Sequence, residues 1–204
     1  MVPGETVGAM MRYGKLEVIC GPMFSGKSTE ILKKAVWYTH GTGTRIMLLK
    51  PAFDVRYGQD RVVNHDGVGF DATPITEMPR VPDDVSAVFI DEVQFCVEPH
   101  FHGDIVDSVR DLLVRGVDVA VSGLDTDWKG RPFPVTATLA AMADSIHKLR
   151  SRCAICGHEA SKTFKKHRND RTVELGQADL YEPRCNIHWH DHTERKGVEL
   201  SLEI

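Results

Sequence analysis

The chain has 204 residues, a formal net charge of −4, 42% hydrophobic residues and 26% charged residues. The length suits one domain, or one domain with a small module, and the composition is ordinary for a globular protein. The negative charge gives no support for a nucleic-acid partner, and no apolar run approaches the ~20 residues of a membrane-spanning helix. We therefore expect a cytoplasmic protein that binds neither membranes nor nucleic acid.

The first elements in chain order surround a glycine-rich motif. Residues 1–14 lack the apolar core of a signal peptide and predict a flexible leader. An apolar run at Leu16–Cys20 predicts a strand, and a helix-like stretch extends from Thr29 to His40. Between them, Gly21–Ser28 match G-x-x-x-x-G-K-[ST], the phosphate-binding P-loop, in the strand–loop–helix setting that this motif requires.

A P-loop binds phosphate mainly through its backbone. Glycines let the chain wrap closely around phosphate oxygens, and N–H groups at a helix N-terminus point at the anion. Lys27 is placed to reach the β- and γ-phosphates, and the Ser28 hydroxyl to ligate Mg²⁺. We therefore predict a nucleoside triphosphate site formed by Gly21, Pro22, Met23, Phe24, Ser25, Gly26, Lys27 and Ser28.

The next segments alternate between strand-like and helix-like patterns. Strands are expected at Arg45–Lys50, Val85–Asp91, Val117–Ser122 and Ile146–Leu149, and helices at Pro99–Arg115 and Thr136–Ala143. The helix at Pro99–Arg115 carries Ile105, Val109, Leu112 and Leu113 on one face. Near-continuous apolar strands alternating with helices predict an α/β fold of the P-loop NTPase type, with a parallel sheet covered by helices on both faces.

The character of the sequence changes near residue 150, where cysteines, histidines and basic residues replace the strand–helix alternation. We predict a P-loop α/β domain over residues 15–149, a small metal-binding module over 150–191 and a tail over 192–204.

Two acidic residues follow the strand expected at residues 85–91. A hydrophobic strand that ends in Asp is the Walker B arrangement, so Asp91 is expected near Mg²⁺. Glu92 is then placed to act on a nucleophile near the γ-phosphate.

Cys153 and Cys156, together with Cys185 and His188, form C-x2-C and C-x2-H pairs. Three thiolates and one imidazole suit a closed, structural Zn²⁺ site. His190 and His192 are neighbouring histidines that compete with His188 for this assignment. The other cysteines, Cys20 and Cys96, are expected to be buried as small hydrophobic residues.

The combination of motifs resembles the thymidine kinases of the human cytosolic and bacterial type. The resemblance runs in order from about residue 15 to about residue 190. Its motifs are GPMFSGKST at 21–29, DVRY at 54–57, HDG at 65–67, DEVQF at 91–95, LDTDW at 124–128, RPF at 131–133 and GQADLY at 176–181.

This resemblance implies phosphoryl transfer from Mg²⁺–ATP to the 5′-hydroxyl of thymidine, with Glu92 as the catalytic base. It implies that Arg56, Asp91 and Gln94 join the P-loop on the phosphate side, that Ser28 and Asp91 hold Mg²⁺, and that Asp54 positions Mg²⁺-bound water or phosphate. The expected nucleoside site comprises Met23, Phe95, Leu124, Trp128, Phe133, Thr163, Val173, Glu174, Leu175, Gly176 and Tyr181. Trp128 departs from the phenylalanine that is usual in the family, and His188 departs from the usual fourth cysteine.

The resemblance also implies a zinc site that anchors a loop covering the substrate, a homotetramer, and feedback inhibition by thymidine triphosphate. The residues leave three alternatives open. The first is a kinase for another deoxynucleoside, and the second is a P-loop ATPase whose zinc module binds nucleic acid. The third is a non-catalytic nucleotide sensor.

Overall fold

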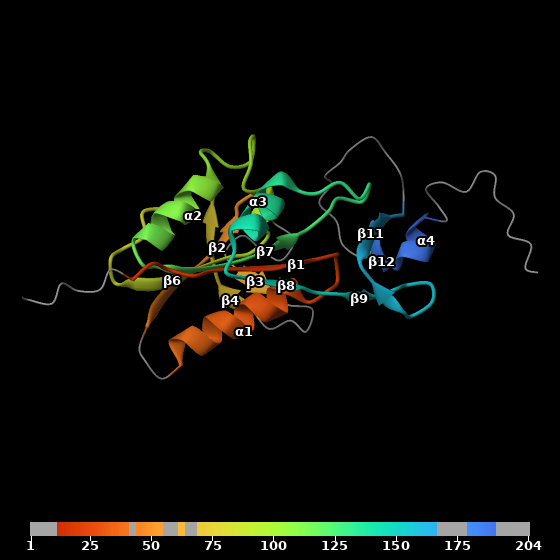
Figure 1. Cartoon of the computed structure of the whole chain (residues 1–204), viewed down its shortest axis with the longest axis horizontal. Helices are drawn as coiled ribbons and strands as arrows, with labels where there is room; N and C mark the ends of the chain where they lie inside the picture. The colour runs from red at the N-terminus through yellow and green to blue at the C-terminus, as the bar shows by residue number, and fades with distance from the viewer. Residues whose placement is uncertain (1–11, 41–43, 55–60, 64–68, 167–178, 191–204) are drawn as a thin grey trace, which may run out of the picture.

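A parallel six-stranded sheet lies between helices on its two faces (Figure 1). The computed structural model describes residues 12–40, 44–54, 61–63, 69–166 and 179–190. The strand order is β5-β2-β6-β7-β1-β8, with every neighbouring pair parallel. The strands are β1 (Leu16–Gly21), β2 (Arg45–Pro51), β5 (Thr73–Ile75), β6 (Val85–Ile90), β7 (Asp118–Leu124) and β8 (Ser145–Lys148).

Helix α1 (Lys27–Thr39) covers one face of the sheet, and α2 (Ile105–Val114) and α3 (Pro134–Met142) cover the other (Figure 1). A central strand such as β6 therefore carries apolar side chains on both of its faces. Val88 and Ile90 of β6 belong to the core cluster that contains Val109 of α2. Phe89 belongs to the second cluster, with Ile31 of α1. Because successive side chains of a strand point to opposite faces, a strand covered on both sides needs a continuous apolar run. The predicted α/β class is confirmed.

The predicted helix at Pro99–Arg115 is wrong in its first six residues, because α2 begins only at Ile105. The preceding segment is held by the sheet edge instead: the His102 N–H donates to the Thr76 carbonyl at 2.6 Å, and His102 forms a β-bridge with Glu77. Asp104 then caps the helix, since its carboxylate accepts hydrogen bonds from the backbone N–H groups of Val106 and Asp107. A cap at this position marks the true helix start.

Replacing Asp104 with alanine is expected to lower the free energy of unfolding by about 1 kcal/mol, because two N–H groups of the first turn lose their acceptor. Urea unfolding followed by circular dichroism measures this change. Asp111→Ala, at an exposed position within the same helix, is the matched control and should cause no such loss. Equal effects of the two substitutions would contradict the capping role.

Several short elements were not predicted from the sequence. They are the edge strand β5, the 3₁₀ turn η1 (Val93–Phe95), the pair β3 (Arg61–Val63) and β4 (Gly69–Asp71), the pair β9 (Ser151–Arg152) and β10 (Glu159–Ala160), the pair β11 (Lys162–Lys165) and β12 (Tyr181–Arg184), and α4 (Asn186–His190). Strands of two to four residues carry too little periodicity to be recognised.

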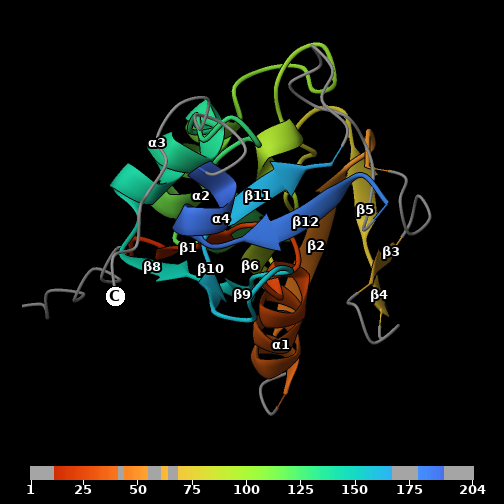
Figure 2. The same cartoon turned by 90° about the vertical axis from the view of Figure 1, so that its right-hand side faces the viewer.

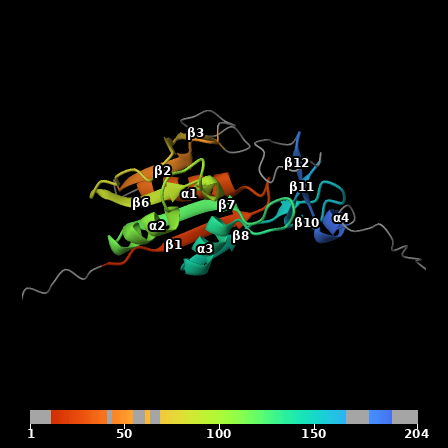
Figure 3. The same cartoon turned by 90° about the horizontal axis from the view of Figure 1, so that it is seen from above.

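The segments from β9 to α4 lie together beyond the carboxyl-terminal end of β1 (Figures 1 and 3). In the view of Figure 2, β11 and β12 run side by side in front of the sheet, as their antiparallel pairing requires. The large sheet ends with β8 at Lys148, which agrees with the expected change near residue 150. The division into leader, main domain, module and tail stays a prediction.

Within the expected leader, residues 1–11 lie outside the described part, whereas Arg12 and Gly14 contact the domain. Arg12 forms an ion pair with Asp118, and the Gly14 N–H donates to the Leu113 carbonyl at 2.8 Å. A Cβ at Gly14 would lie 2.0 Å from the Val117 carbonyl oxygen, so this close approach requires glycine. Among the described residues, every helix is too short or too polar to cross a membrane.

Candidate active site and metal centre

The P-loop connects the carboxyl end of β1 to the first turn of α1. Three of its residues have positive φ angles, Gly21 with φ 146°, Phe24 with φ 62° and Gly26 with φ 86°. Left-handed residues within such a loop turn successive N–H groups toward one point and create a concave site for an anion. The helix that begins at Lys27 adds the positive end of its dipole to the same place.

Two P-loop side chains face the protein interior. Lys27 is buried, and its ammonium donates to the Pro22 carbonyl at 2.7 Å, which closes the loop on itself. The Ser25 hydroxyl is buried and has no hydrogen-bond partner among the described residues. Because a buried hydroxyl is normally hydrogen bonded, this group supports binding of a polar ligand in the loop.

Asp91 follows β6 and lies close to the P-loop, with β7 between their two strands. Its carboxylate accepts a hydrogen bond from the Ser122 hydroxyl on β7, and the Ser28 hydroxyl on α1 lies near enough to lower the pKa of Asp91. Burial, followed by the negative charge of Glu92, raises the pKa of Asp91 to about 6. A bound cation would favour the ionised carboxylate, and the oxygens of Asp91 and Ser28 are ligands that Mg²⁺ prefers. These two residues therefore fit the expected Mg²⁺ site.

Glu92 is held in a left-handed conformation, with φ 54° and ψ 40°, and its side chain is half-buried. Gln94 fixes the carboxylate by donating to Glu92 Oε2 at 2.5 Å. The same amide accepts the Leu124 N–H at 3.0 Å, so it is anchored to the end of β7. A Cβ at Gly123 would lie 2.6 Å from Gln94 Oε1, so a side chain there would displace this amide.

The contacts of Gln94 favour a role different from the one expected from the resemblance. Its side chain is buried, and both ends of its amide are engaged by protein groups. Direct phosphate binding by Gln94 stays a prediction, whereas positioning of Glu92 follows from the observed contacts.

The expected nucleoside residues come from the P-loop, η1, the loop after β7 and the metal module. The Met23 N–H donates to Thr163 Oγ1 at 3.0 Å, which joins the P-loop to β11. Phe95 is buried in η1 and makes an edge-to-face contact with Phe53, with ring centroids 5.4 Å apart. Leu124 ends β7 beside Gln94.

Lys165 brings two expected nucleoside residues together. Its ammonium lies 5.8 Å from the centroid of the Trp128 ring and 5.9 Å from that of Tyr181. Its side chain is almost fully buried. The sequence did not identify Lys165 as a site residue, because a single lysine in a basic stretch is typical of a solvated loop.

Phe133 precedes α3 at the end of the loop that carries Trp128, and its N–H donates to the Asp125 carbonyl at 3.1 Å. Asp54 is buried and its carboxylate lies 3.7 Å from the ammonium of Lys50, so it is already paired with a cation. Arg56, Val173, Glu174, Leu175 and Gly176 lie outside the described residues.

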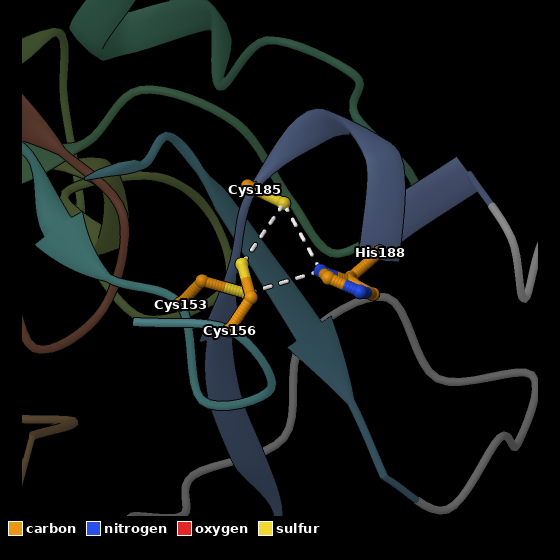
Figure 4. Close-up of side chains that lie close together, drawn as sticks. All are labelled: Cys153, Cys156, Cys185 and His188. Atoms are coloured by element: carbon orange, nitrogen blue, oxygen red, sulfur yellow. Dashed lines mark hydrogen bonds between the residues drawn. The ribbon is translucent and has the colours of Figure 1, made fainter. Parts of the chain in front are cut away.

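Cys153, Cys156, Cys185 and His188 converge in the module (Figure 4). The distances are 3.6 Å from Cys153 Sγ to His188 Nδ1, 3.2 Å from Cys185 Sγ to His188 Nδ1, and 3.9 Å from Cys156 Sγ to Cys185 Sγ. Ligand atoms of a tetrahedral Zn²⁺ site lie about 3.5–3.8 Å apart, and the four ligand atoms here lie within 4.8 Å of one another, so small side-chain shifts bring them to that spacing. The four side chains therefore fit a structural zinc ion.

The surroundings of the Cys153 thiol also favour metal binding. Burial opposes ionisation of Cys153, but hydrogen bonds from backbone amides outweigh it and lower the pKa of this thiol to about 6. The thiolate is the form that binds zinc. Of the competing histidines, His190 is exposed, with its ring against Trp189 rather than in the cluster. His192 lies outside the described part of the chain.

Comparisons with known proteins agree with this arrangement. The family model described as "TK: Thymidine kinase" matches residues 14–189. The chain is 37% identical to the thymidine kinase of Bacteroides thetaiotaomicron over 177 residues, which covers 85% of this chain and 86% of that protein. It is 39% identical to the thymidine kinase of Coprothermobacter proteolyticus over 187 residues, covering 86% and 90% of the two chains. The chain therefore belongs to the thymidine kinase family.

Proposed function

We infer that this chain transfers the γ-phosphoryl group of ATP to the 5′-hydroxyl of thymidine, giving thymidine 5′-monophosphate for nucleotide salvage. The observation that carries this function is that the Asp91–Glu92 pair lies beside the P-loop, in a chain of the thymidine kinase family. The P-loop supplies a phosphate site, and the adjacent half-buried carboxylate supplies a base for an alcohol acceptor.

On the phosphate side, the P-loop amides and Lys27 bind the β- and γ-phosphates, and Arg56 adds a planar pair of donors. Ser28 and Asp91 hold Mg²⁺, which supplies positive charge against the transferring phosphoryl group. Lys27 must then leave the Pro22 carbonyl, to which it donates in this structure, and turn toward the phosphates.

On the acceptor side, Glu92 accepts the proton of the 5′-hydroxyl as the oxygen attacks phosphorus. An alcohol is a poor nucleophile while it is protonated, so a base at this position lowers the barrier. Gln94 orients the Glu92 carboxylate through its hydrogen bond to Oε2. Orientation matters because proton transfer requires hydrogen-bond distance to the acceptor.

For the nucleoside, Phe95, Trp128, Phe133 and Tyr181 provide flat apolar walls, and Met23, Leu124 and Thr163 complete the pocket. Val173, Glu174, Leu175 and Gly176 present backbone groups to the thymine edge. The zinc site anchors the chain on both sides of this segment, since Cys153 and Cys156 precede it and Cys185 and His188 follow it.

Regulation and assembly are part of the same proposal. Thymidine triphosphate carries both a thymine and a triphosphate, so one molecule can occupy the nucleoside and phosphate sites together and act as a feedback inhibitor. The resemblance to the family supports a homotetramer that works in the cytoplasm.

The direct test is transfer of radiolabelled γ-phosphate from Mg²⁺–ATP to thymidine, with deoxycytidine, deoxyadenosine and deoxyguanosine in parallel. Thymidine 5′-monophosphate is expected as the dominant product. Transfer to another nucleoside would keep the mechanism and move the specificity to the pocket around Trp128. Absence of transfer from folded, zinc-loaded protein, together with ATP hydrolysis stimulated by nucleic acid, would contradict the proposal.

A further inference from the structure

Two hydroxyl groups of the metal module contact adjacent residues of the P-loop. The Ser151 hydroxyl donates to the Phe24 carbonyl at 2.9 Å, and Thr163 Oγ1 accepts the Met23 N–H at 3.0 Å. The two hydroxyls come from different strands, β9 and β11. The tip of the P-loop is therefore held by two strands that lie outside the six-stranded sheet.

Ser151 contacts Phe24, a P-loop residue whose backbone conformation is unfavourable by itself. Phe24 has φ 62°, a left-handed conformation that is unfavourable for a residue with a large side chain. This conformation contributes to the concave arrangement of P-loop amides, because it reverses the direction of successive N–H groups. Without an external partner, the loop is expected to relax toward ordinary backbone conformations that no longer converge on a phosphate.

Ser151 is itself tied to the metal site. It pairs with Ala160 across β9 and β10, and Cys153, two residues later, is one of the four converging ligands. The Ala154 N–H then donates to the Pro183 carbonyl of β12 at 2.9 Å. A continuous path of short paired strands therefore runs from the metal ligands to the Phe24 carbonyl.

We propose that Ser151 is a positioning residue for ATP binding: it holds Phe24 in its left-handed conformation and so couples the metal module to the phosphate site. The inference rests on the proposed function only in taking the P-loop as the ATP site. Ser151 touches neither substrate, and its effect passes through the P-loop backbone.

The test measures binding of the Mg²⁺ complex of the non-hydrolysable analogue AMP-PNP by calorimetry, which requires no phosphoryl transfer. Ser151→Ala is expected to raise the Kd by about three- to tenfold, the range for loss of one hydrogen bond. Ser151→Thr keeps the hydroxyl and should restore binding. Ser161→Ala removes a hydroxyl that contacts Asn186 within the same module, and should bind the analogue like the parent protein.

Three further measurements distinguish a positioning role of Ser151 from a general role in stability. They are the zinc content, the melting temperature, and the affinity for thymidine in the absence of nucleotide. Zinc content and thymidine affinity are expected to be unchanged in Ser151→Ala, and the melting temperature to fall by no more than about 2–4 °C, as for loss of one hydrogen bond. Unaltered analogue binding in this variant would overturn the proposal, and so would an equal weakening of thymidine binding or a loss of zinc. If the parent protein bound the analogue but phosphorylated no nucleoside, the proposed function would fail while the role of Ser151 could still be measured.

Discussion

Replacing Glu92 with glutamine is expected to lower kcat by about 10²- to 10⁴-fold while leaving the affinity for Mg²⁺–ATP within about threefold of the parent value. The substitution keeps the size of the side chain and an oxygen that can still accept from Gln94, as Glu92 Oε2 does here. It removes the ability to take a proton from the 5′-hydroxyl. The steady-state rate of thymidine phosphorylation and the binding of AMP-PNP measure the two quantities separately.

Glu98→Gln is the matched control, because it makes the same chemical change six residues later on an exposed loop. Glu98 contacts only the neighbouring His102 among the interactions observed in the described part of the chain, with Oε1 3.2 Å from Nδ1. This variant should turn over like the parent protein. Near-normal turnover of Glu92→Gln would rule out the base assignment, and equal losses in both variants would point to an effect of net charge.

Loss of a metal ligand is expected to give the second large effect. Cys185→Ser or His188→Asn should reduce zinc to well below one ion per chain and thymidine phosphorylation by more than about tenfold. A zinc ion held by the four ligand side chains would link the end of β9, which begins at Ser151, to the end of β12, which begins at Tyr181. Without the ion, strands of two to four residues would lose this link, and we expect the proposed nucleoside site to lose residues that cover it.

The six-stranded sheet has its own core and should stay folded in these variants. We expect thymidine binding to weaken most and binding of AMP-PNP to weaken only as far as loss of the Ser151 contact allows. Elemental analysis, calorimetry and helical circular dichroism measure these outcomes. His190→Asn, which changes an exposed histidine outside the cluster, should keep its zinc. A fully active, zinc-free Cys185→Ser protein would contradict the role of the metal.

Much of the main domain could be predicted because its signals are local and strong. The apolar runs of β1, β6 and β7 identified a buried parallel sheet, and the P-loop motif identified the strand-to-helix connection. The predicted ends of α1 differ from the observed ends by only one or two residues. The four metal ligands were found from their spacing, and the structure brings all four together.

What could not be predicted depends on contacts between distant residues. The resemblance implied a phosphate-side role for Gln94, whereas its contact with Glu92 became visible only in the structure, where a left-handed turn at Glu92 lets the Gln94 amide donate to the carboxylate. Lys165 became a candidate only when the fold placed it beside Trp128 and Tyr181. The start of α2 was misplaced because the hydrophobic pattern says nothing of the β-bridge at His102.

Gly123 illustrates how the space beneath a site can be as constrained as the site itself. It contacts no substrate in the proposed mechanism, yet any side chain there would push against Gln94 Oε1, Val93 and Thr136. Displacement of Gln94 would remove the hydrogen bond that its amide donates to Glu92 Oε2. We therefore expect substitutions at Gly123 to be tolerated as poorly as substitutions of the catalytic residues, although glycine acts here only by lacking a side chain.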